Sequence, residues 1–214
     1  MAPNTIRKLQ AFGLAAALVL DSALPVRRHS LTRALLATAL AAITKAPLGF
    51  RPPALWAGVR IGSVAASVVT VAVAAGAAIP RVRAAIADRP PPASPARWLA
   101  LQIPVGTVWA EEAAYRAALA TLATEGFGPR TGRLVQAIAF GLSHIPDARA
   151  AGEPVLGTVL VTGAAGWVFG WLAERSGSLA APMLTHLAIN EAGALAALRV
   201  QSSVQSRRVA FHDH

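Results

Sequence analysis

Two adjacent acids and a base occupy the middle of one long apolar segment. The segment runs from Trp98 to Ala123, and its centre carries Glu111, Glu112 and Arg116. As a single helix, about 26 residues would be roughly 39 Å long, which exceeds a hydrocarbon core of about 30 Å. A charge at that depth costs about 2.5–3.5 kcal/mol and normally faces a bundle interior or a watery cavity. The alternative is a tilt or break at Pro104, which would put Glu111 at a water interface.

Only one of the two acids has an ion-pair partner on its own helix. Glu112 and Arg116 are four residues apart with the acid first, so the spacing predicts a structural ion pair. Glu111 is rotated away from Glu112 by about 100° and has no such partner on the helix. We therefore expect Glu111 to find a partner on another helix or to take up a proton.

Two further apolar segments each carry a histidine that is paired with a second residue at the same spacing of four. Phe140 and His144 form one pair, and His186 and Asn190 form the other. Either histidine alone would be typical of a satisfied structural residue. Both histidines and Asn190 lie in apolar segments of the same half of the chain as an unpaired acid. This recurrence predicts one shared site.

These residue types fit the hydrolysis of an amide bond. A carboxylate and an imidazole, Glu111 and His144, could deprotonate a water as a general base. A second imidazole and a carboxamide, His186 and Asn190, could donate hydrogen bonds to the oxyanion. Glu111, His144 and His186 are equally a candidate zinc triad, although the chain contains no HExxH helix.

The ordered set of motifs resembles the CAAX prenyl protease 2-like proteins, also called the CPBP intramembrane proteases. Their signature is EExxxR, FxxxH and HxxxN on three hydrophobic helices, and this chain reads EEAAYR from position 111, FGLSH from 140 and HLAIN from 186. The resemblance covers about Trp98 to Leu198. It implies an intramembrane endopeptidase in which Glu111 and His144 activate water, His186 and Asn190 stabilise the oxyanion, Glu112 and Arg116 brace the site, and Phe140 packs beside it.

The resemblance leaves the metal and the substrate open. The family is often described as metalloproteases, whereas a glutamate-type mechanism needs no cofactor. Four convergent polar groups suffice for both water activation and oxyanion binding, which favours the metal-free mechanism over zinc. Ile145 and Pro146 follow His144 where some prenyl-processing members carry further histidines. The expected partner is therefore a peptide or membrane-protein substrate, prenylated or not.

The composition indicates a membrane protein. Of the 214 residues, 55% are hydrophobic and 14% are charged, against about 25% charged in a soluble domain; the mean hydropathy is +0.50. Seven apolar runs predict an all-α, polytopic transmembrane bundle of about seven helices. The runs are Leu9–Leu24, which we interpret as a retained helix and not a signal peptide, Leu31–Phe50, Ala54–Ile79, Trp98–Ala123, Arg130–Ile145, Gly152–Ala173 and Leu179–Leu198.

The chain divides into three parts by chemistry. Residues 1–95 hold N-terminal transmembrane helices and a Pro-rich loop, residues 96–200 the catalytic core helices, and residues 201–214 a basic polar tail. We expect residues 80–95 to be a loop, because three consecutive prolines exclude a helix there. Three small residues predict close helix packing in the third run. They are Gly58, Gly62 and Ser63.

The basic residues indicate a lipid bilayer and not a nucleic acid as partner. The net charge is +10, but the arginines form short clusters between the apolar runs, as in loops that flank membrane helices. The positive-inside rule puts the C-terminus and the Pro-rich loop in the cytoplasm. Arginine and alanine usage favours a bacterial source, and hence the bacterial inner membrane.

Two other functions fit the same residues less well. A non-catalytic membrane scaffold or bacteriocin-immunity-type protein would keep the polar cluster for packing alone. A small transporter would use Glu111 as a proton site, but such proteins usually contain an internal repeat, and the sequence shows none.

Overall fold

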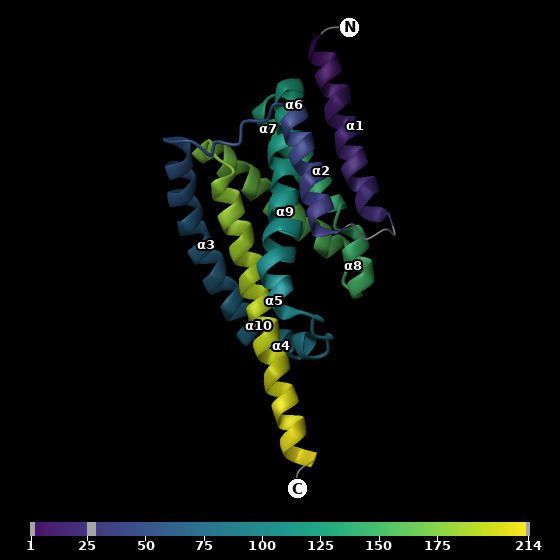
Figure 1. The fold of residues 1–214 in the computed structure, drawn as a ribbon. Coiled ribbons are helices and arrows are strands. Elements are labelled where there is room, and N and C mark those ends of the chain that lie inside the picture. Colours follow the sequence, from purple (N-terminus) through teal and green to yellow (C-terminus); the bar gives the residue numbers. More distant parts are fainter. Residues whose placement is uncertain (1–2, 25–28, 213–214) are drawn as a thin grey trace.

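The chain folds into a bundle of helices that run alternately along one axis (Figure 1). The computed structural model describes residues 3–24 and 29–212, and this part of the chain contains helices and no strand. The all-α prediction is therefore confirmed. The long helical segments are α1 (Pro3–Ala23), α2 (Ser30–Ile43), α3 (Ala54–Ala78), a continuous stretch over residues 95–127, α7 (Pro129–Leu142), α9 (Val155–Ser176) and α10 (Ala180–His212), with short helices α4 (Pro80–Ala87) and α8 (Ile145–Ala151).

The stretch over residues 95–127 is the element that carries both acids. It begins as α5 (Pro95–Arg97), continues as the π-helices η1 (Trp98–Trp109) and η2 (Glu112–Leu119), and ends as α6 (Ala120–Phe127). The wide winding is evident at Ala110, whose N–H reaches the Val105 carbonyl five residues back. Pro104 lies inside η1 and does not end the helix. The alternative of a break at Pro104 is therefore wrong. π-Helices are rare in proteins, and the single-turn ones that occur are often found at functional sites. The two longer π-helices here therefore mark residues 98–119 as a candidate functional segment.

Each of the seven predicted runs overlaps a helical segment, but some bounds need correction. Helix α2 ends at Ile43, so the second run is helical over a shorter range than Leu31–Phe50. The predicted loop over residues 80–95 is wrong in its first half, which forms α4. Pro80 occupies the first turn of α4, where a missing N–H costs nothing, and residues 90–92 remain outside any helix.

Close packing between α3 and α10 confirms part of the small-residue prediction. A Cβ at Gly62 would lie 2.8 Å from the Ala181 Cα, and one at Gly58 would lie 2.8 Å from the Ser178 side chain. Ser63 is exposed and takes no part. On the other side, α7 packs against α9, α6 against α7 and α1 against α6, while α2 lies along η1 and η2. The acids of the central stretch are thereby enclosed.

Among the described residues, two helices are both long and apolar enough to cross a membrane, α3 and α9. Only 6% of the most apolar window of α3 is buried inside the protein, and 22% of that of α9. Leu156 and Leu160 of α9 and Val68 and Val71 of α3 are examples of the large apolar side chains left exposed. Such a continuous apolar surface is typical of contact with lipid. Helices α4 and α5 lie toward the end of the bundle from which the C-terminal part of α10 projects (Figure 1).

Candidate active site

His186 of α10 connects the two adjacent acids. Its Nδ1 lies 2.8 Å from Glu112 Oε1, and its Nε2 lies 3.8 Å from Glu111 Oε2. Because a carboxylate oxygen accepts, Nδ1 carries the proton in the first contact, and this fixes the orientation of the ring. The side chains of Glu111 and His186 are 14% and 8% exposed. The structure therefore brings these two predicted site residues together in the interior.

The Glu112 side of the site is sealed. Arg116 NH1 lies 3.4 Å from Glu112 Oε1, and both side chains are fully buried. The predicted structural ion pair is present. The Arg116 guanidinium lies over the rings of Phe140, at 3.9 Å, and Phe169, at 5.0 Å. Aromatic faces attract a desolvated cation, so these rings hold Arg116 in place.

Phe169 is a residue of the site that the sequence did not single out. Its ring stacks on the His186 ring at 5.0 Å with an interplanar angle of 25°. Phe140 meets the same imidazole edge-on at 6.3 Å. Phe140 is in turn seated against Gly166, where a Cβ would lie 2.9 Å from the ring. Phe169 lies in an Ala- and Gly-rich apolar run with no polar neighbour at a helical spacing, so no sequence signal marks it.

The Glu111 side of the site is more open and receives a cation from a different helix. Arg33 NH2, on α2, lies 3.4 Å from Glu111 Oε1, and the Arg33 side chain is 46% exposed. The expectation that Glu111 finds its partner elsewhere in the chain is confirmed. The other oxygen, Oε2, is buried and has no hydrogen-bond partner among the described residues. A buried oxygen of this kind is available to a water or a substrate group.

His144 lies at the corner between α7 and α8, where Pro146 prevents α7 from continuing. Its Nδ1 is 2.7 Å from the Phe140 carbonyl oxygen. A carbonyl only accepts, so Nδ1 carries the proton and Nε2 of the neutral ring keeps its lone pair. The ring packs edge-on against Phe140, with centroids 4.6 Å apart. His144 thus adjoins the cluster through Phe140, and its polar contacts in the described structure are to Phe140 and Ser143.

Asn190 lies one helical turn beyond His186 on α10. One face of α10 packs against η1 through Met183, Leu187 and Ala194. Asn190 is seven, three and four residues away from these three, so it lies on the same face. Its Nδ2 is buried and makes no hydrogen bond within residues 3–24 and 29–212. An unpaired buried amide is costly, so this donor is expected to meet a group supplied from outside the chain.

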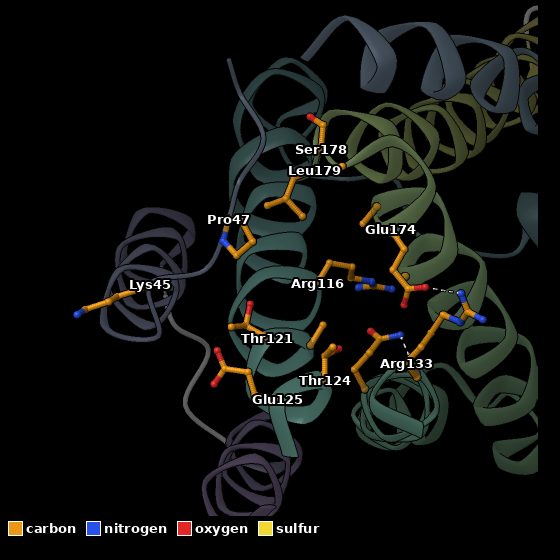
Figure 2. Close-up of a pocket in the computed structure, with 15 residues that line it drawn as sticks. Lys45, Pro47, Arg116, Thr121, Thr124, Glu125, Arg133, Glu174, Ser178 and Leu179 are labelled. Carbon is orange, nitrogen blue, oxygen red and sulfur yellow. Dashed lines mark hydrogen bonds and ion pairs between the residues drawn. The ribbon is translucent and has the colours of Figure 1, made fainter. Parts of the chain in front are cut away.

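A cavity of about 390 Å³ adjoins the site on the far side of Arg116 (Figure 2). Figure 2 shows Arg116 reaching across this cavity toward Glu174 and Arg133, and the last two are paired at 2.7 Å. Of the predicted site residues, this cavity touches Arg116 and none of the other six. It is therefore not the place where the candidate catalytic groups meet.

The predicted zinc ligands do not gather as a triad in the described part of the chain. No three His, Cys, Asp or Glu side chains there come together closely enough to hold a metal ion. The donor types themselves suit zinc, because the Nδ1 atoms of His144 and His186 are both occupied and their Nε2 atoms are free to bind. The assignment of zinc to Glu111, His144 and His186 remains a prediction.

Comparison with known proteins identifies a family that part of the chain resembles. The sequence profile described as type II CAAX prenyl endopeptidase Rce1-like matches residues 93–192. This range contains all seven predicted site residues and excludes α1 to α4 and most of the connector before α5. Neither a curated protein nor a solved structure matches the chain.

Proposed function

We propose that the chain, whose residues 93–192 match the Rce1-like family of type II CAAX prenyl endopeptidases, hydrolyses a peptide bond within the membrane by means of a water that Glu111 and His144 activate. Two of the buried polar atoms without a hydrogen-bond partner belong to candidate catalytic residues, and this observation carries the proposal. Glu111 Oε2 can accept a proton, and Asn190 Nδ2 can donate a hydrogen bond, and neither has a partner in the described structure.

The reaction follows from what each group can do. Glu111 Oε2 removes a proton from water as the water oxygen bonds to the carbonyl carbon of the substrate, and His144 Nε2 accepts a hydrogen bond from the same water. The oxyanion that forms is stabilised by hydrogen bonds from Asn190 Nδ2 and His186 Nε2. Glu111 then delivers the proton to the departing amide nitrogen as the C–N bond breaks, which leaves a carboxylic acid and an amine.

Glu112 has a supporting role in this scheme. For His186 to donate from Nε2 while Nδ1 donates to Glu112, the ring must carry both protons and a positive charge. The buried Glu112 carboxylate, 2.8 Å from Nδ1, supplies the compensating negative charge. Arg116 and Phe140 hold Glu112 and the imidazole in position. The groups of this chain account for both water activation and oxyanion binding, so no step requires a metal.

We further propose that the bundle crosses a bacterial inner membrane about seven times, with the C-terminus and the Pro-rich connector in the cytoplasm. The exposed apolar faces of α3 and α9 support the embedding. The basic residues Arg81, Arg83 and Arg89 of the connector support the orientation by the positive-inside rule. The substrate is then a peptide or membrane protein whose scissile bond lies close to the lipid surface.

The test uses purified protein in lipid vesicles and two quenched fluorescent peptides that end in the same CAAX sequence, one farnesylated and one not. Wild-type protein is expected to cleave at least the farnesylated peptide. Glu111→Gln and His144→Ala are each expected to lower the rate by at least about 1000-fold while the protein still inserts. Full activity in either variant, or cleavage of neither peptide by wild type, would contradict the proposal.

Metal analysis of the same samples decides between the glutamate-type reaction and zinc. Activity in protein without bound metal supports the glutamate-type reaction. Activity that is lost on zinc removal and returns on zinc addition supports a Glu111, His144 and His186 zinc site. A scaffold or immunity-type protein predicts a third pattern, in which the variants unfold more easily and no peptide is cleaved by any form.

A further inference from the structure

A helix outside the family segment supplies a cation to the candidate catalytic carboxylate. Arg33 lies on α2, sixty residues before the matched range 93–192 begins, yet its NH2 lies 3.4 Å from Glu111 Oε1. The second oxygen, Oε2, faces His186 Nε2 at 3.8 Å and has no hydrogen-bond partner in the described structure. The two oxygens of Glu111 therefore differ, because a cation contacts one and the other is buried without a hydrogen-bond partner.

We propose that Arg33 is a positioning residue, which fixes Oε1 so that Oε2 presents its lone pair to the hydrolytic water. The inference rests on the proposed function, since it assigns Arg33 a role toward the base of that reaction. The 3.4 Å contact is longer than a strong charge-assisted hydrogen bond, so Arg33 orients the carboxylate chiefly by attraction between opposite charges. Without it, the Glu111 carboxylate can rotate, and either oxygen can turn toward His186. A base that is misplaced by a fraction of an ångström loses much of its effect.

The fold anchors α2 in the way that such a role requires. Thr38, five residues after Arg33, accepts a 2.9 Å hydrogen bond from Trp109 Nε1 on η1. At the start of α2, Ser30 approaches η1 at Gly106, where a Cβ would lie 2.6 Å from the Ser30 hydroxyl. Ala37 and Ala41 are buried against η2 and its neighbours. Arg33 therefore extends from a helix that is fixed to the acid-bearing helix on both sides of it.

The alternative role for Arg33 is a direct contact with substrate. Its side chain is 46% exposed, so an anionic group of the substrate could reach it. The two roles differ kinetically. A residue that positions the base affects the chemical step and lowers kcat, whereas a residue that binds the substrate equally in the ground state and the transition state raises KM.

The experiment measures kcat and KM of Arg33→Met and Arg33→Lys with the farnesylated CAAX peptide in vesicles. Methionine keeps much of the length of arginine but removes the charge, and is expected to lower kcat roughly 10-fold to 100-fold at unchanged KM. Lysine restores a cation and is expected to recover most of that loss. The matched control is Arg7→Met. Arg7 on α1 pairs with Glu125 at 2.8 Å and is 45% exposed, much like Arg33, but it does not contact Glu111, so the kinetics of this variant should stay at the wild-type level.

Three results would overturn the role of Arg33. These are wild-type kcat in Arg33→Met, a rise in KM without a fall in kcat, or a lysine variant as slow as the methionine variant. Unfolding of all variants by SDS in mixed micelles separates a kinetic effect from a folding defect. Glu111→Gln separates a failure of the role of Arg33 from a failure of the proposed peptidase function. An inactive Glu111→Gln with a fully active Arg33→Met removes the inference and leaves the proposed function. A fully active Glu111→Gln removes both.

Discussion

The two acids at the centre of this protein are neighbours in sequence, yet they lie in different surroundings. Glu112 is fully buried, contacts Arg116 on its own helix and accepts a hydrogen bond from His186. Glu111 is 14% exposed and contacts Arg33, which comes from another helix and is half exposed. A fully buried ion pair suits a structural role, because it is costly to disturb, whereas a partly exposed acid that a second helix contacts suits a role in chemistry. Two identical and adjacent side chains can therefore differ in function, because each contacts different neighbouring helices.

The largest effect on stability is expected on the sealed side. Arg116→Met leaves the Glu112 charge in the interior without its cation, and loss of one partner of a buried pair costs about 3–5 kcal/mol. SDS titration in mixed micelles measures this change in the free energy of unfolding. Glu111→Gln is the matched control, since its pair with Arg33 is partly exposed and its loss is expected to cost under about 1 kcal/mol. Equal destabilisation of both variants would contradict the contrast between the two sides.

A double variant sharpens this test. Glu112→Gln with Arg116→Met removes both charges of the ion pair, so neither partner is left buried without the other. The glutamine oxygen can still accept the hydrogen bond from His186 Nδ1, which lies 2.8 Å from Glu112 Oε1. The double variant should therefore be more stable than Arg116→Met alone. A double variant that is less stable than either single change would show that the pair is not the reason for the loss.

The sequence predicts the sealed side of the site better than the open side. A spacing of four on one helix suffices to pair Glu112 with Arg116, because both residues obey the same helical geometry. Arg33 is beyond this reasoning, since its contact with Glu111 depends on how α2 docks on η1. Phe169 is missed for the same reason, because its stacking on His186 joins α9 to α10. The π-winding of η1 and η2 is also set by tertiary packing and not by a residue pattern.

Prolines explain the errors in the fold. Residues 80–95 contain a run of three prolines and were expected to be a loop, but a proline at the first turn of a helix is favourable. Pro80 therefore begins α4. Pro104 lies within η1 without ending it. Proline removes one backbone hydrogen bond, and the remaining bonds and the packing of the helix keep η1 continuous. The assignment of Glu111, His144, His186 and Asn190 to catalysis remains a prediction, since their contacts in the described structure do not reveal the chemistry.

A smaller effect is expected where α10, the helix that carries His186, rests against α3. Gly62→Ala would bring a Cβ to 2.8 Å from the Ala181 Cα and 2.9 Å from its carbonyl oxygen. Because these neighbours are backbone, α3 and α10 must move apart, and overpacking of this kind costs about 1–3 kcal/mol. The control is Gly76→Ala in the same helix, where a Cβ meets no described atom within 4 Å. That change should leave SDS unfolding unaltered or slightly improved, since alanine favours a helix. Similar losses at both positions would contradict the close α3–α10 contact.

The smallest effect is expected on the open side, at the anchor of α2. Trp109→Phe removes the 2.9 Å hydrogen bond to Thr38, and one neutral hydrogen bond contributes about 1 kcal/mol. Trp56→Phe on α3 is the control, because the Trp56 side chain is 64% exposed. Thr38 still donates to the Ala34 carbonyl in the variant, and the buried contacts of Ala37 and Ala41 keep α2 in place. Trp109→Phe should therefore lower kcat less than Arg33→Met does. If the two variants lose kcat equally, the placement of Arg33 beside Glu111 depends on this single hydrogen bond, and the open side is held much more loosely than the sealed one.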